Sequence, residues 1–244
     1  MSATPGRSLY GGLEKVPPVQ KEMIGGKAVY LVEDHHHVLL PWREICGELG
    51  VLPHVLTLDH HTDTLPAFTH FNEVNGCCHP LHIPVEEALC DLRHDEHFDF
   101  AVRNGIIRSA TIFSHVNFAV DVNPALTIVH DPPADDTAET LENYYAAILE
   151  SDFLRRNLQQ APLPHGVPYI LDIDLDCFKG IRSIMPEDPG VFQQLVRNAS
   201  AVTICRERDW VRLLNLDFGK LQYGFFLEKL LLLIRNSGAA QGVF

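Results

Sequence analysis

The stretch that most constrains this chain is residues 55–64, where a short apolar run ends abruptly in ligand-type side chains. The run 55–58 is not ended by Gly or Pro, which is typical of a strand buried on both faces. Asp59, His61 and Asp63 then follow at alternate positions. Because such side chains leave an extended backbone from one face, the three can converge on one point. Two carboxylates and one imidazole suit a divalent ion such as Mn²⁺, with Zn²⁺ or Fe²⁺ as alternatives.

A second stretch repeats this design further along the chain. Residues 167–171 are largely apolar, and Asp172, Asp174 and Asp176 follow at every second position. Carboxylates this close repel one another, and at least one would be forced to keep its proton. A pair of bound cations removes that repulsion, so the two stretches predict a metal centre rather than two solvated strand ends. Asp176 itself is expected to cap a turn or to face solvent.

The composition fits a globular enzyme with a large core. The 244 residues are 46% hydrophobic and 21% charged, and one domain is expected. We divide the chain into an irregular lead-in at 1–26, a catalytic domain at 27–236 and a tail at 237–244. The net charge of −13 argues against nucleic acid or an anionic membrane as a partner, and it is compatible with a cationic substrate.

The sequence pattern favours a cytoplasmic protein. Residues 1–20 are polar and include Pro17 and Pro18, unlike a secretory signal. The six cysteines form no C-x-x-C pair and are expected to be reduced core thiols. The apolar segment 227–234 is too short to span a bilayer and is expected to be a buried or partner-facing helix. The sequence is compatible with a homo-oligomer.

Strand and helix patterns alternate along the chain. We expect strands at 27–32, 55–58, 110–113, 125–129, 167–174 and 201–205. We expect helices at 38–49, 84–92, 137–158 and 188–198. The segments 66–82 and 91–104 are expected to be a loop and a charged surface segment. This order predicts an α/β fold, a three-layer α/β/α sandwich with a mostly parallel sheet whose carboxyl-terminal edge gathers the ligand-type residues.

The order of these motifs resembles that of the arginase and agmatinase group of ureohydrolases. The hallmark strand end Asp-x-His-x-Asp is matched at 59–63, a later Asp-x-Asp at 172–174 and an earlier Asp-His at 34–35. The sequence at 33–36 and the LDIDLD segment at 171–176 are more similar to those of a divergent branch of this group. That branch includes the peptide arginases, which convert arginine in ribosomal peptide precursors to ornithine.

The resemblance implies two Mn²⁺ ions per chain and a set of ligands for each. The first ion would be held by His35, Asp59, Asp63 and Asp172. The second would be held by His61, Asp59, Asp172 and Asp174, so that Asp59 and Asp172 bridge the two. His36 is the alternative to His35, because the run of three histidines leaves the register open by one.

The same resemblance suggests residues for substrate and proton handling. Glu207, near the end of a later strand, is the candidate for binding the guanidinium group. Asp63 would relay a proton within the centre, and His79 is the nearest downstream imidazole for a proton shuttle. Two such ions would lower the pKa of water from about 15.7 towards neutral and so produce a nucleophile.

The chain also departs from the family pattern. It is shorter than ordinary arginases and lacks the paired glycines before Asp-His and the Pro that closes the second motif. The Asn and Ser that bind a free amino-acid headgroup have no counterpart in loop 66–82, which favours arginine within a peptide over free arginine. The leading hypothesis is a manganese-dependent hydrolase of linear amidine C–N bonds that releases urea and leaves ornithine. A zinc-dependent deacetylase-like amidohydrolase and a non-catalytic metal-binding protein are the alternatives.

Overall fold

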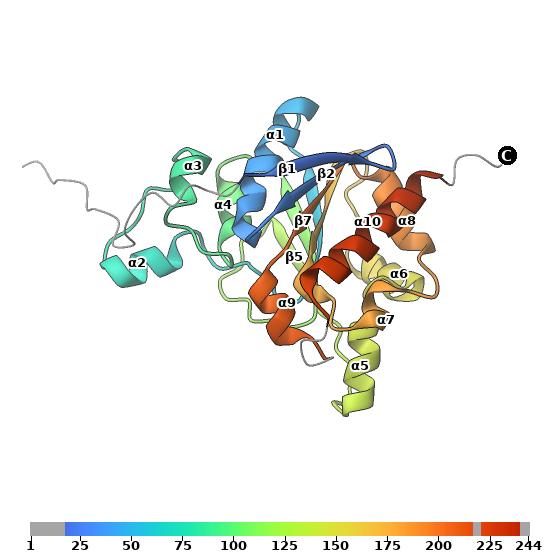
Figure 1. Ribbon diagram of the computed structural model, residues 1–244. Helices are drawn as coiled ribbons and strands as arrows, with labels where there is room; N and C mark the ends of the chain where they lie inside the picture. The colour runs from blue at the N-terminus through green and yellow to red at the C-terminus, as the bar shows by residue number, and fades with distance from the viewer. Residues whose placement is uncertain (1–17, 217–220, 240–244) are drawn as a thin grey trace, which may run out of the picture.

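A seven-stranded sheet forms the centre of the computed structural model, which describes residues 18–216 and 221–239 (Figure 1). The strands are β1 (Gln20–Ile24), β2 (Lys27–Val32), β3 (His54–Asp59), β4 (Ser109–Ser114), β5 (Leu126–Val129), β6 (Tyr169–Asp174) and β7 (Ala201–Cys205). They lie in the order β1-β2-β7-β6-β3-β4-β5. β1 pairs antiparallel with β2, and the other neighbouring strands pair in parallel. The predicted mostly parallel sheet is confirmed.

Helices cover both faces of this sheet, which confirms the three-layer α/β/α sandwich (Figure 1). The helices are α1 (Leu39–Leu49), α2 (Thr69–Asn75), α3 (Val85–Ala88), α4 (His97–Arg103), α5 (Ala138–Ala146), α6 (Ser151–Gln160), α7 (Ile181–Ile184), α8 (Gly190–Asn198), α9 (Arg208–Leu214) and α10 (Tyr223–Ala239). α6, α8 and α10 pack on one face through a core that includes Leu56 and Leu171. α1 and α4 pack on the other through a core that includes Val55 and Ile170.

The first strand corrects the expected lead-in. Gln20–Ile24 was assigned to irregular chain but forms β1, an edge strand whose first four residues are exposed and therefore carry no apolar pattern. Gly25 and Gly26 make the turn into β2 with φ of 58° and 79°, a conformation that glycine adopts at little cost. Residues 1–17 of the lead-in lie outside the described part of the chain.

The predicted helix at 137–158 is two helices, α5 and α6. Glu150 separates them with an extended backbone, φ −68° and ψ 138°. Its carboxylate accepts the backbone N–H groups of Glu187 and Asp188 at 2.7 and 3.0 Å, so contacts with a distant loop hold the break in place.

Three other segments differ from expectation. The segment 91–104 was expected on the surface, yet it contains α4, whose Phe98 and Phe100 are fully buried against the sheet. The loop 66–82 contains the short helix α2, which buries no residue. The tail prediction at 237–244 is wrong for 237–239, which continue α10, and 240–244 lie outside the described residues.

Within the described residues, no helix is long and apolar enough to cross a membrane. The six cysteines are free. Cys177 and Cys205 are buried as expected, whereas Cys77, Cys78 and Cys90 are exposed rather than in the core.

Candidate metal centre

The ligand-type residues gather at the carboxyl ends of β3, β6 and β7, beside the 3₁₀ turn that follows β2. The register places Thr57, Asp172 and Thr203 side by side on three neighbouring strands, and Asp174 beside Cys205 one step further on. These alternate positions share the face covered by α1 and α4. Because parallel strands end at one edge, residues distant in sequence meet there.

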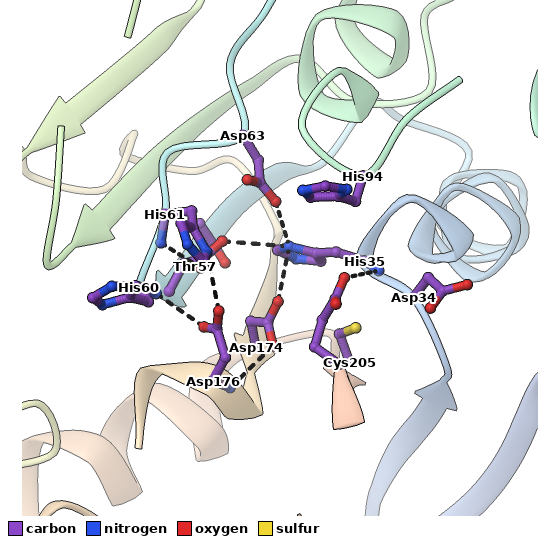
Figure 2. Close-up of polar contacts among 12 residues, drawn as sticks. Asp34, His35, Thr57, His60, His61, Asp63, His94, Asp174, Asp176 and Cys205 are labelled. Carbon is purple, nitrogen blue, oxygen red and sulfur yellow. Dashed lines mark hydrogen bonds and ion pairs between the residues drawn. The ribbon is translucent and has the colours of Figure 1, made fainter. Parts of the chain in front are cut away.

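His35 lies at the middle of the cluster and is fully buried (Figure 2). Its Nδ1 is 2.8 Å from a carboxylate oxygen of Asp63, 3.3 Å from Asp59 and 3.4 Å from Asp174. One ring N–H cannot satisfy three acceptors. Ligand atoms at right angles around an ion with bonds of about 2.1 Å lie about 3.0 Å apart, close to these separations. His35, rather than its alternative His36, is therefore the histidine that lies among the carboxylates.

Asp172 lies in the cluster, but its contacts differ from those that the resemblance implies. Its carboxylate accepts hydrogen bonds from the hydroxyl of Thr57 at 2.8 Å and from that of Thr203, and it lies 2.8 Å from His35 Nε2. These three donors take most of the acceptor capacity of its two oxygens, and among the described residues it joins none of the ligand groups. A carboxylate that takes the N–H of a histidine leaves the other ring nitrogen free for a metal ion. Asp172 is therefore placed to orient His35, which argues against the bridging role that the resemblance implies.

A second ligand group comprises Asp59, His61 and Asp176, whose ligand atoms lie within 4.8 Å of one another. His61 Nδ1 is 3.0 Å from a carboxylate oxygen of Asp176. Asp176 is only 1% exposed, so the expectation that it faces solvent is wrong. Asp59 also belongs to the group with His35 and Asp174, and it is the residue that links the two groups.

The chemistry of the donor set fits two divalent ions. Asp59 Oδ2 is buried and meets no hydrogen-bond donor in good geometry, although His35 Nδ1 is near. Burial raises the pKa of Asp59 and, together with the charge of Asp176, raises that of Asp174 well above the ordinary value. Burial and the charge of Asp59 raise the pKa of Asp63 to about 7. Carboxylates that are protonated because no cation is bound are expected to lose these protons when a metal ion binds.

Glu207 lies at the same edge, two residues after β7. It is 8% exposed and its Oε1 accepts the backbone N–H of His35 at 3.0 Å. Burial raises its pKa to about 8. Its backbone has φ of 32° and ψ of 52°, and Asp63 also has a positive φ of 50°. A left-handed conformation at a residue other than glycine persists where surrounding structure enforces it, often at functional sites.

Three partly exposed rings border the buried cluster. His61 is one of them, with 24% of its side chain exposed. The ring centroid of Trp210, from the first turn of α9, lies 5.2 Å from that of His61 and 6.2 Å from that of His94. His94 lies beside Asp63 and His35 in the close-up (Figure 2). A molecule that reaches the cluster from solvent between these rings would contact aromatic surface first.

The structure does not bring His79 to the cluster. Its ring stacks on Phe68 at 3.9 Å, with Nδ1 2.9 Å from the carbonyl oxygen of Pro80 and Nε2 3.2 Å from Asp91. This packing accounts for the histidine without a catalytic role. The other sequence candidates, namely His35, Asp59, His61, Asp63, Asp172, Asp174 and Glu207, lie together at the one edge.

Comparisons with known proteins add little to this geometry. No model of a known family matches the sequence, and no curated protein matches it. Among solved structures, a proclavaminate amidino hydrolase from Streptomyces clavuligerus aligns with 86% of this chain and 64% of its own, at 15% identity and a TM-score of 0.46. A hypothetical agmatinase from Burkholderia thailandensis aligns with 87% and 60%, at 15% identity and a TM-score of 0.48. The chain spans less than two thirds of either structure, and likeness this low does not assign an activity.

Sequence reasoning missed two residues near the cluster besides the place of Asp176. Trp210 follows Glu207 by three positions, so helical spacing could have placed both on one face. His97 begins α4 inside a segment expected on the surface, and no pattern pointed to it.

Proposed function

We propose that this chain is a manganese-dependent hydrolase of a guanidino group that acts on arginine within a peptide and releases urea. The observation that supports it is that Asp59 is common to two ligand groups, one with His35 and Asp174 and one with His61 and Asp176. Carboxylate-rich sets with one or two imidazoles suit Mn²⁺, and a shared carboxylate holds two ions close together.

Two such ions, when bound, supply the nucleophile by lowering the pKa of water from about 15.7 towards neutral. The chain's own groups bind and orient the substrate. Glu207 presents a buried carboxylate beside the cluster, and burial makes its charged form unfavourable until a cation pairs with it. A guanidinium group supplies that charge together with parallel N–H donors.

Asp63 is our candidate for proton transfer. It lies 2.8 Å from His35 Nδ1, inside the cluster. We assign it to taking the proton released when water attacks the guanidinium carbon and passing it to the departing amine. Breaking the C–N bond then gives urea and ornithine.

The choice of a peptide as substrate rests on the sequence of loop 66–82 and on the partly exposed rings that border the cluster. Loop 66–82 carries no counterpart of the family's headgroup-binding Asn and Ser, and it packs around His79 instead. Trp210 and His61 offer ring faces to the alkyl arm and to the plane of the guanidinium group, and neither requires a free α-amino or α-carboxyl group.

A urea-release assay tests this proposal. Protein loaded with Mn²⁺ is given free arginine, agmatine and an arginine-containing peptide, and urea and ornithine are measured. We expect most turnover with the peptide, and we expect Glu207→Gln to lower kcat/KM at least about tenfold with unchanged metal content. Two bound ions with no urea from any substrate would contradict the proposal and favour a binding protein. One Zn²⁺ with amide hydrolysis would favour the deacetylase-like alternative.

A further inference from the structure

His97 is a second buried imidazole at the centre, and the function above leaves it unused. It is fully buried at the start of α4, and its ring centroid lies 4.4 Å from that of His35. Its Nδ1 lies 2.6 Å from the carbonyl oxygen of His94, which places the proton on Nδ1. Nε2 is buried and has no hydrogen-bond partner among the described residues. Leaving a buried polar atom unpaired destabilises a fold, so this lone pair requires an explanation.

The ligand atoms of His97, His35 and Asp63 lie within 4.8 Å of one another. Nε2 of His35 faces Asp172, so Nδ1 of His35 is the nitrogen available as a ligand atom. This holds both for the group with His97 and Asp63 and for the group with Asp59 and Asp174. Because one nitrogen has one lone pair, the two groups that share His35 describe a single ion.

We propose that Nε2 of His97 is a further ligand of the ion held by His35, so that this position carries two imidazoles beside its carboxylates. The inference rests on the proposed metal centre. Both histidines have one ring nitrogen committed to an oxygen acceptor outside the ligand group. The other nitrogen faces the cluster carboxylates in His35 and has no partner in His97, an arrangement that suits ligating histidine. A second imidazole shifts the metal preference of this position towards Co²⁺, Fe²⁺ or Zn²⁺, because a set made of carboxylates alone suits Mn²⁺.

His54 shows that a bare ring nitrogen alone is not sufficient. It is 2% exposed, its Nδ1 lies 2.8 Å from Ser109 Oγ, and its Nε2 is also without a partner. It begins β3, at the edge of the sheet opposite the cluster, and among the described residues it joins no ligand group. What distinguishes His97 is the presence of His35 and Asp63, and this makes His54 a matched control.

The test is metal titration of metal-free protein with two substitutions. His97→Phe keeps the ring packing against His35, Trp42 and Phe98 but removes both nitrogens. His97→Asn keeps an N–H donor for His94 and removes the ligand atom. Calorimetric titration with Co²⁺ and with Mn²⁺ gives affinities, and Co²⁺ absorption reports the ligands. Circular dichroism and Tm of the metal-free proteins report folding.

We expect both substitutions to weaken Co²⁺ binding at one of the two positions by at least about tenfold, to weaken Mn²⁺ binding less, and to change the Co²⁺ spectrum. His54→Phe should leave affinities and spectrum unchanged. Wild-type Co²⁺ affinity and spectrum in either folded His97 variant would overturn the proposal. The titration does not require turnover. If Co²⁺ binding depends on His97 but no urea is released, only the proposed function is contradicted. If urea is released but Co²⁺ binding does not depend on His97, only this inference is contradicted.

Discussion

Asp172, Asp174 and Asp176 occupy alternate positions but meet three different environments. Asp172 lies inside the sheet, where Thr57 and Thr203 of the neighbouring strands donate to it. Asp174 is the last residue of β6 and faces His35. Asp176 follows in a 3₁₀ turn and faces His61. The position of each carboxylate relative to the strand end therefore decides whether it orients a ligand or is available as one.

Substitution of these acids separates the two roles. Asp174→Asn removes a carboxylate from the group around His35, and we expect the protein to lose at least one of its two ions. Asp172→Asn keeps the ligands but weakens the hold on His35 Nε2, so we expect two ions with affinity lowered about 10–100-fold. Elemental analysis and metal titration measure both. Equal loss of metal in the two variants would contradict the separation.

At this scale the sequence predicted the cluster better than the role of each member. Alternation predicted that Asp59, His61 and Asp63 would converge from an extended chain, but β3 ends at Asp59 and Asp63 has a positive φ of 50°, so the loop after the strand brings Asp63 to His35. It could not show how far β6 extends beside its neighbours, because that depends on the register with Thr57 and Thr203. Asp172 was therefore assigned as a ligand, and Asp176 was expected to cap a turn or to face solvent.

Among the elements, α9 is the one to which the proposed function gives the main contacts with substrate. Glu207 caps it, and Trp210 lies one turn later. Aromatic faces attract guanidinium groups by about 0.5–2 kcal/mol. We therefore expect Trp210→Leu to raise KM for the peptide several-fold with little change in kcat, and Trp210→Phe to retain most of the affinity.

Steady-state kinetics measure both Trp210 variants. Leu213, 70% exposed on the same helix, gives the control Leu213→Ala, which should leave KM unchanged. If Trp210→Leu had the kinetics of this control, α9 would have no part in binding the guanidinium group.

The break between α5 and α6 also makes a prediction. Glu150→Ala removes the acceptor for two backbone N–H groups. We expect a loss of about 1 kcal/mol in free energy of unfolding, measured by urea denaturation. Glu187→Ala keeps its backbone N–H and should cost less. Equal losses would show that the carboxylate of Glu150 does not hold the break.

Strands in the middle of the sheet were predictable because their apolar runs are buried on both faces. Six of the seven strands match the expected segments, and the exception is the exposed edge strand β1. α4 was missed because Asp99 and Arg103, which form an ion pair, made a buried segment read as charged surface. The burial of α4 comes from packing against distant segments of the core, which local patterns do not contain.

For the whole molecule, the centre ties stability to pH when no metal is bound. Burial raises the pKa of Asp63 to about 7 and that of Glu207 to about 8. Burial would lower the pKa of His61, but Asp176 raises it to about 9. Above about pH 6.5, where unfolded histidines are neutral, the folded chain binds more protons than the unfolded chain, so stability falls as pH rises. Near pH 8 this trend is opposed by Lys179, whose pKa burial lowers to about 8.

We therefore expect the Tm of metal-free protein to fall between pH 6.5 and 8. Mn²⁺ should raise Tm more at pH 8 than at pH 6.5, because metal and protons compete for the same groups. At about 100 times its Kd an ion adds about 2.7 kcal/mol, roughly 5–10 °C for a chain of this size. Calorimetry of chelator-treated protein provides the measurement. A metal-free Tm that rose across this range would contradict the charge arrangement.

The most direct test of the account is a crystal structure of the Mn²⁺-loaded protein with anomalous scattering recorded at the manganese edge. We expect two anomalous peaks, one bound by His35, Asp63 and Asp174 and one by His61 and Asp176, with Asp59 contacting both ions. A single peak, or ions bound by Asp172 without Asp176, would contradict it.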